Sequence, residues 1–257
     1  MADRRRVIYY SDEMNDEFSS AVIKPCRIDG SYRYGGETPA WRAARLFWYR
    51  IVAFPVAAVF LKVRYGHRIV GRGVLRKWRG NPYFIFGNHT NAAADALVPS
   101  FVCFPNGTSV IVHPNNVSMP VLGRITPYLG ALPLPDDMAA ARNFSRALED
   151  RISRGEAVAI YPEAHIWPFY TKIRPFTEAP FRYPVQFGTP VFCFTNTYQK
   201  RRFTDFPRMV TYVDGPFFPN TELPPKERRK DLRDRVYRTM TERSLLSDVE
   251  RIRYIKR

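Results

Sequence analysis

The sequence predicts an α/β fold: a mostly parallel sheet flanked by helices, preceded by a basic amphipathic helical segment suited to a membrane interface. Short, continuous apolar runs alternate with longer amphipathic stretches, a pattern typical of strands buried on both faces between helices. A length of 257 residues accommodates one such domain with appendages. We expect an N-terminal arm over residues 1–40, a basic interfacial helical segment over 41–80, the α/β domain over 81–220 and a charged C-terminal helix over 221–257.

The first forty residues contain no apolar stretch of the kind found in secretory signals, so we expect none. The Pro, Gly and polar residues between Gly30 and Pro39 favour an extended arm lying over the domain. Three cysteines, Cys26, Cys103 and Cys193, lie far apart without metal-like spacing. We therefore expect reduced core thiols in a cytosolic protein.

Positive charge is concentrated ahead of the predicted domain. The chain carries 40 Lys and Arg residues against 24 Asp and Glu, a net charge of +16, and no acidic residue lies between Glu37 and Asp95. An ordinary solvated face mixes charges of both signs, so this stretch is expected to face an anionic partner. Its basic residues are Arg42, Arg45, Arg50, Lys62, Arg64, Arg68, Arg72, Arg76, Lys77 and Arg79.

Residues 41–65 combine these basic residues with large aromatic and aliphatic side chains, a composition that suits helices lying in the headgroup region of a membrane. The longest uncharged run, Ile51–Leu61, is too short to span a bilayer and contains Pro55. The alternative is simple packing on the domain core, which would not require the absence of acids. We expect a membrane surface with anionic lipids, not nucleic acid, as the partner, and a peripheral or monotopic protein on the cytoplasmic face.

Within the domain, strands and helices alternate. A helix is expected from Met138 to about Arg154, capped by Asp136 or Asp137 and ended by Gly155, and a second charged helix begins near Lys226. Parallel strands bring their carboxyl ends to one edge of a sheet, where ligands bind in open α/β folds. Apolar runs predict strands at residues 82–87, 108–113, 157–161, 190–195 and 209–213.

Polar residues follow the first of these strands. Asn88, His89, Thr90 and Asn91 come directly after it, and Asp95 follows three alanines. A His with a carboxylate within reach is the minimal arrangement for general-base catalysis, because the carboxylate fixes the imidazole tautomer and stabilises the imidazolium. A structural hydrogen-bonded pair is the alternative on spacing alone.

A second block, Tyr161-Pro162-Glu163-Ala164-His165, follows a later strand. The two blocks, in this order, resemble the His–Asp block and the Phe-Pro-Glu-Gly-Thr-Arg block of the glycerophospholipid acyltransferase family, which includes the lysophosphatidic acid acyltransferases. The chain differs from the family in two places. Five residues rather than four separate His89 from Asp95, and His165-Ile166 replaces the Thr-Arg pair. The pair therefore meets only if the turn before the helix accommodates the extra residue.

The resemblance implies that His89 is the general base and that Asp95 orients it. It implies that Glu163 shapes the acceptor pocket, and that Asn88 and Thr90, beside the base, contact substrate. Backbone amides at the turn are expected to stabilise the oxyanion.

A different cation must take the place of the missing Arg, because the acceptor carries a phosphate. Arg174 is the first choice, since guanidinium binds phosphate through paired hydrogen bonds. Lys172 is the second, and His165 the third because it is only partly protonated at neutral pH.

The implied activity is transfer of a fatty acyl group from a thioester, acyl-CoA or acyl carrier protein, to 1-acyl-sn-glycerol 3-phosphate, giving phosphatidate. The sequence contains no metal motif, Gly-rich phosphate loop or Gly-x-Ser-x-Gly elbow. We therefore expect no metal, no cofactor and direct transfer without an acyl-enzyme. Two alternatives remain open. One is acylation of another lysophospholipid or of glycerol 3-phosphate, and the other is a non-catalytic basic protein that binds membranes or nucleic acid.

Overall fold

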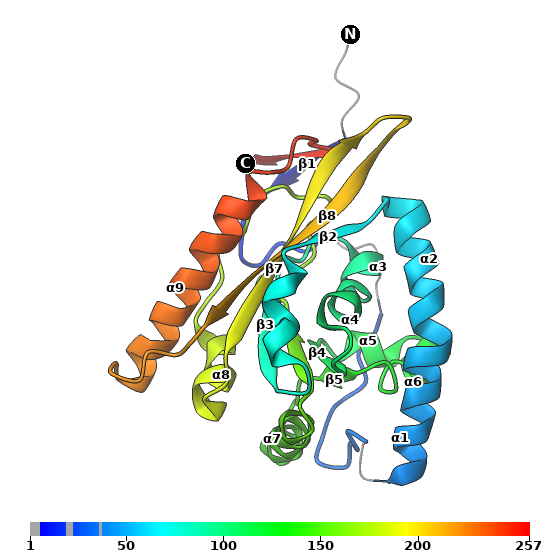
Figure 1. Ribbon diagram of the computed structural model, residues 1–257, viewed down its shortest axis with the longest axis vertical. Coiled ribbons are helices and arrows are strands. Elements are labelled where there is room, and N and C mark those ends of the chain that lie inside the picture. The colour runs from blue at the N-terminus through cyan, green and yellow to red at the C-terminus, as the bar shows by residue number, and fades with distance from the viewer. Residues whose placement is uncertain (1–5, 19–22, 36–37) are drawn as a thin grey trace.

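A seven-stranded sheet forms the centre of the protein, seen in a computed structural model that describes residues 6–18, 23–35 and 38–257 (Figure 1). The strand order is β2-β8-β7-β3-β6-β4-β5, and every neighbouring pair is parallel except β7 and β8, which form an antiparallel hairpin. The strands are β2 (Arg68–Val70), β3 (Tyr83–Gly87), β4 (Thr108–Val112), β5 (Ala131–Pro133), β6 (Ala157–Ile160), β7 (Val191–Arg201) and β8 (Thr204–Phe217). The mostly parallel α/β architecture predicted from the sequence is confirmed.

Strand β3 is the middle strand, hydrogen-bonded to β6 on one side and β7 on the other. All five of its residues are buried, as expected for a strand covered on both faces. A Cβ at Gly87 would lie 2.1 Å from the ring of Phe194, so only glycine fits where β3 ends against β7.

Helices cover both faces of the sheet. One face packs against α7 (Met138–Ser153), α8 (Arg182–Phe187) and α9 (Pro225–Ser244), and the other against α2 (Phe54–Tyr65), α3 (Ala92–Asp95) and α4 (Val98–Cys103). The predicted cap of α7 is present, because the Asp137 side chain accepts from the Ala140 amide. The remaining short helices are α5 (Asn115–Ser118), α6 (Leu122–Ile125), η2 (Arg72–Trp78) and η3 (Ala179–Phe181).

The segment ahead of the domain forms one continuous helix, Pro39–Tyr65, made of α1 (Pro39–Leu46), a π-helical stretch η1 (Phe47–Ala53) and α2. Pro55 does not break this helix: it lies in the first turn of α2, and the π-helical turns just before it accommodate a residue without an amide proton. With 27 residues, the helix is long and apolar enough to cross a membrane by length and composition. It nevertheless packs lengthwise beside the sheet domain (Figure 1).

This helix has one side turned to the domain and one to solvent. Arg45 on the inner side binds Glu156 at 2.5 and 2.9 Å, and Arg50 donates to the carbonyl of Asn106 at 3.1 Å. Burial alone would raise the pKa of Glu156, but the adjacent Arg45 outweighs it and holds that pKa below its ordinary value. Part of the acid-free charge therefore pairs within the protein instead of facing a partner. The exposed side is apolar and includes Leu46, Phe47, Trp48, Ile51, Val56, Val59, Phe60 and Val63.

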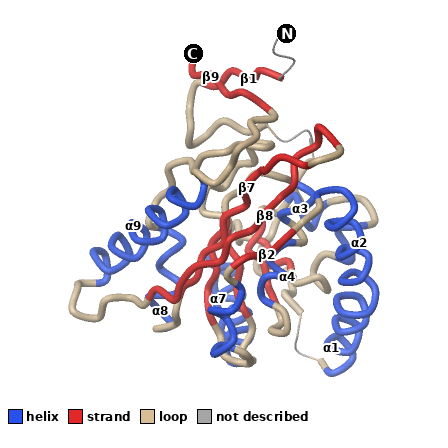
Figure 2. Tube along the Cα trace, turned by 45° about the horizontal axis from the view of Figure 1, so that its top comes forward, coloured by secondary structure: helices blue, strands red, loops and turns tan. Residues whose placement is uncertain are grey.

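The two ends of the described chain meet in a second, two-stranded parallel sheet of β1 (Arg6–Tyr10) and β9 (Ile252–Lys256), which Figure 2 shows beyond the tip of the main sheet. Neither strand was predicted.

The described part of the arm does lie over the domain, because Ile28 is fully buried in the main core. Cys103 and Cys193 are buried free thiols as expected, whereas Cys26 is exposed, so the core assignment was wrong for that residue.

Candidate active site

The predicted catalytic pair lies at the carboxyl end of β3. His89, Thr90 and Asn91 continue the strand as an extended turn, and Asn91 (φ −159°) caps α3 by accepting from the Ala94 amide. The helix therefore begins after the extra residue, which lies in the extended turn. His89 Nδ1 and Asp95 Oδ2 are 2.9 Å apart.

The Asp95 carboxylate is 1% exposed and surrounded by donors. Its Oδ2 accepts from the amides of Thr90 (2.8 Å) and Asn91 (2.7 Å), and its Oδ1 accepts from Asn196 Nδ2 (3.2 Å). With these donors on one side, the carboxylate is placed to accept the Nδ1 proton of His89, and the other ring nitrogen, Nε2, then has no proton to donate. No described residue bonds Nε2, and the His89 side chain is 18% exposed.

These contacts also correct one expectation about the turn. The amides of Thr90 and Asn91 are bound to Asp95, and the amide of His89 donates to Glu163 Oε2 at 3.0 Å. The three amides hold the two carboxylates in place, so in this structure they are already bonded and do not point to a free oxyanion site.

Tyr161, the first residue of the second block, supports the histidine from the side. The two rings stack with centroids 4.4 Å apart and an interplanar angle of 20°. The Tyr161 hydroxyl donates to the Asp95 carbonyl at 2.5 Å. Burial raises the pKa of Tyr161 well above its ordinary value, so the hydroxyl stays protonated as a donor.

A buried chain of hydrogen bonds continues from Asp95 to the far side of β7, through residues that the sequence reading missed. Thr211 donates to Asn196 Oδ1 at 2.7 Å, which fixes the Asn196 amide with its NH₂ toward Asp95. Because that hydroxyl proton is used, His67 Nε2 must be the donor to Thr211 Oγ1, 2.8 Å away. Burial and the nearby Lys62 lower the pKa of His67 to about 4, so this histidine is neutral at physiological pH.

Asn88 and Thr90, expected to contact substrate, are both buried against protein groups. Asn88 bridges β3 and β7, donating to the Asn196 carbonyl (3.0 Å) and accepting from the Asn196 amide (2.7 Å). The Thr90 hydroxyl lies 2.9 Å from that of Tyr198. With exposures of 1% and 0%, they position the turn.

Glu163 and Arg174 form a buried unit beside the pair. Glu163 accepts from the His89 amide and, at 3.0 Å, from the Arg174 amide, while the two side chains approach to 3.5 Å. Burial raises the pKa of Glu163, and the charge of Arg174 opposes that rise.

The Arg174 guanidinium is 1% exposed, donates to the carbonyls of Glu13, Glu163 and His165, and lies 5.0 Å from the Trp167 ring. From the sequence we predicted that this side chain binds the phosphate of the substrate. Its burial leaves it holding the loop around Glu163 instead.

His165 and Lys172 are the more accessible of the residues predicted to bind phosphate. Lys172 is exposed. His165 Nδ1 lies 3.3 Å from Glu17 Oε2, and the Ile166 amide donates to the same carboxylate at 3.1 Å. The loop thus binds an anionic group of the N-terminal arm at the place where the family carries its Thr-Arg pair. Among the described residues, no group of three or more His, Cys, Asp or Glu side chains could hold a metal ion.

Residues 68–195 match the family model described as Acyltransferase, a range that includes both blocks. The fold is similar to that of the 1-acyl-sn-glycerophosphate (LPA) acyltransferase PlsC from Thermotoga maritima. The TM-score is 0.55, with 82% of this chain and 90% of that chain covered at 16% sequence identity. No curated protein matches the sequence. The chain belongs to the glycerophospholipid acyltransferase family and is an O-acyltransferase.

Proposed function

We propose that the protein transfers a fatty acyl group from a thioester donor to the free hydroxyl of 1-acyl-sn-glycerol 3-phosphate, giving phosphatidate. The observation that carries this proposal is the His89–Asp95 pair. One ring nitrogen is bound to a buried carboxylate, and the other is left without a protein partner in the described chain. The acyltransferase family supports the reaction type, and PlsC, which has a similar fold, is a 1-acyl-sn-glycerophosphate acyltransferase and so acts on this acceptor.

In the proposed reaction, Nε2 of His89 takes the proton from the acceptor hydroxyl as its oxygen attacks the thioester carbonyl carbon. A C–O bond forms, the tetrahedral intermediate collapses and the C–S bond breaks. The imidazolium, stabilised by Asp95, returns the proton to the leaving thiolate, so ester and thiol are the products. No serine or cysteine nucleophile is needed.

The exposed apolar side of the helix Pro39–Tyr65 supports a membrane location for this reaction. Ile51, Val56, Val59 and Val63 are each more than 60% exposed on it. An apolar stripe of this kind is unfavourable in water and typical of helices lying in a membrane interface. We place the protein on the membrane surface that holds its lipid acceptor, on the cytoplasmic face, with anionic lipids attracting the remaining basic residues.

The acceptor's phosphate is assigned to the loop after Glu163. This loop already holds the Glu17 carboxylate with the Ile166 amide and His165. A phosphate bound there would replace Glu17, and His165 with the exposed Lys172 would supply positive charge.

The test is an acceptor panel assayed in detergent micelles with radiolabelled acyl-CoA and acyl carrier protein thioesters. We expect turnover with 1-acylglycerol 3-phosphate to exceed that with 1-acylglycerol, another lysophospholipid or glycerol 3-phosphate.

His89→Ala should lower kcat by roughly a hundredfold or more, the usual range for losing a general base. Asp95→Asn should also lose most activity, because tautomer control is lost.

His113→Ala is the histidine control, because this exposed residue follows β4 at the same edge of the sheet, two strands from β3, and its printed side-chain hydrogen bond is to the Asn115 amide and not to the pair. It should retain full activity. An activity above a few per cent in a folded His89→Ala variant would mean that another group is the base, and a different best acceptor would replace the proposed substrate.

A further inference from the structure

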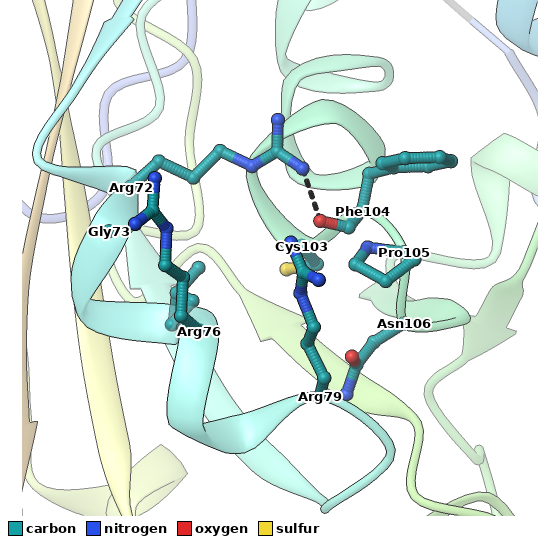
Figure 3. A pocket seen from close by; sticks show the side chains of 9 residues that line it. Arg72, Gly73, Arg76, Arg79, Cys103, Phe104, Pro105 and Asn106 are labelled. Carbon is teal, nitrogen blue, oxygen red and sulfur yellow. Dashed lines mark hydrogen bonds between the residues drawn. The ribbon is translucent and has the colours of Figure 1, made fainter.

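A second basic site lies at the opposite end of β3 from His89. A cavity of about 210 Å³ opens between η2 and the turn that follows α4. Three arginines line it, Arg72, Arg76 and Arg79, and Figure 3 shows their side chains extending toward the same space. A five-residue strand is about 16 Å long, so this cavity is separate from the catalytic pair.

The cavity concentrates positive charge without compensation. No Asp or Glu lines it, and among the residues that the structure describes no carboxylate pairs with Arg76 or Arg79. Arg72 donates to the Phe104 carbonyl, which fixes one side of the opening. Arg76 and Arg79 are exposed and Arg72 is half-buried, so their like charges repel one another at the mouth of the cavity, and a bound anion relieves that repulsion.

Hydrogen bonds from one side chain, Asn106, hold the two walls of the cavity together. The Asn106 side chain accepts from the Gly80 amide (3.2 Å) and donates to the carbonyls of Trp78 (3.1 Å) and Gly155 (3.0 Å). These bonds hold the end of η2 against the turn after α4. The arginines therefore come from a fixed scaffold and not from a loose loop.

The cavity also adjoins the interfacial helix. The Phe104 ring lies 5.2 Å from that of Phe54 in α2, and Arg50 of the same helix lies 4.9 Å from the Phe104 ring. Phe104 itself is 42% exposed. Only one aromatic ring thus separates the arginines from the helix whose outer side is apolar.

We propose that this cavity binds a phosphate group, independently of the acyl acceptor, through Arg76 and Arg79 with Arg72 in support. Guanidinium forks bind phosphate oxygens in pairs, and two free arginines match a group carrying one or two negative charges. The phosphate comes from the headgroup of an anionic phospholipid in the surface on which the helix lies, or from a small soluble phosphate.

The test compares the intact chain with Arg76→Gln/Arg79→Gln at physiological salt. One arm measures sedimentation with phosphatidylcholine vesicles, with and without phosphatidate. The other measures binding of inorganic phosphate and glycerol 3-phosphate by calorimetry. Arg142→Gln/Arg146→Gln is the matched control, because it removes the same charge from exposed positions on α7. Thermal unfolding checks each variant, and Arg79→Gln alone replaces the double variant if that one does not fold.

We expect the phosphatidate-dependent part of vesicle binding to fall by at least about tenfold in Arg76→Gln/Arg79→Gln, because this variant loses two charge contacts with the phosphate. The control should change it by less than about twofold. Loss confined to the soluble-phosphate arm would identify a small phosphate as the ligand. If both arms match the control variant, the cavity is not a phosphate site.

Discussion

The Asp95 carboxylate sets the geometry of the active site. It accepts from two backbone amides, from Asn196 and from His89, so it orders the turn that carries the base as well as the base itself. The extra residue between His89 and Asp95 therefore does not separate the two side chains. It lengthens an extended turn in which the amides of Thr90 and Asn91 donate to Asp95, and the helix starts afterwards.

The contact between His89 and Asp95 could be predicted from sequence because both belong to one short segment after one strand. Asn196 could not, because it lies 101 residues from Asp95 and meets it only through the order of β3 and β7 in the sheet. The available signal was an Asn directly after a buried apolar run. Arg174 was misassigned for a related reason: sequence shows a cation near Glu163 but not that its guanidinium is enclosed by carbonyls.

His67 ends the hydrogen-bond chain behind Asp95 and makes stability depend on pH. Its pKa is lowered to about 4 by burial and by Lys62, compared with 6.5 for an ordinary histidine. The unfolded chain therefore binds more protons between these two pH values. The His67 contribution is intact above pH 6.5 and is lost as pH falls toward 4, by about 3 kcal/mol in total.

His67→Gln should consequently flatten the loss of stability on acidification, because Gln does not titrate and can still donate to Thr211. Between pH 7 and 5 its free energy of unfolding, measured by urea denaturation, should change less than that of the unsubstituted protein. His113→Gln is the control, since His113 is exposed and should keep the original slope. Equal slopes for all three proteins would contradict the assignment of a neutral, buried His67.

At the scale of elements, the composition of the helix Pro39–Tyr65 predicted its character but not the direction in which its basic side chains point. Basic and apolar residues without acids predicted an interfacial segment. Composition could not show that Arg45 and Arg50 turn inward to Glu156 and to backbone carbonyls. Their inward orientation turns these two charges away from the exposed side, and residues 51–61, which follow, contain no charged residue, which is the arrangement a membrane interface favours.

Ile51→Asp/Val59→Asp should weaken attachment to phosphatidylcholine vesicles by roughly tenfold or more, because two exposed apolar side chains lose their burial in lipid. Sedimentation at low and high salt measures it, and salt should have little effect on the apolar part. Met138→Asp/Leu245→Asp is the matched control, with equally exposed residues elsewhere. If the two double variants bind alike, the helix is not the anchor.

Elements with a complete local signal were predicted to within a few residues. Strands β3 and β6 are uninterrupted apolar runs, and α7 has both its cap at Asp137 and its end at Gly155. Strands β7 and β8 extend beyond their predicted ends, because their pairing in a long hairpin continues past the apolar run. No residue of strand β1 is fully buried, and its partner β9 lies near the other end of the chain, so neither the strand nor its pairing was predicted.

At the scale of the whole molecule, the two ends of the chain close over the second block. Trp167, fully buried, stacks on Tyr254 of β9 with centroids 4.9 Å apart and contacts the ring of Tyr10 of β1 at 4.7 Å. The Tyr254 hydroxyl donates to the Pro168 carbonyl at 2.9 Å. The loop that presents Glu163 to His89 is thus held by strands from both ends of the chain.

Tyr254→Ala should therefore loosen this loop from a distance. Removing a stacked ring and one hydrogen bond should destabilise the loop by on the order of 3 kcal/mol. We expect this loss to appear mainly as more frequent local opening of the loop. We expect faster amide hydrogen exchange over residues 163–174 and a several-fold lower kcat, because the Glu163 contact to the His89 amide is weakened. Arg253→Ala, an exposed neighbour on the same strand, is the control and should change neither quantity. Unchanged exchange over the loop in Tyr254→Ala would show that the paired termini do not hold the active site in place.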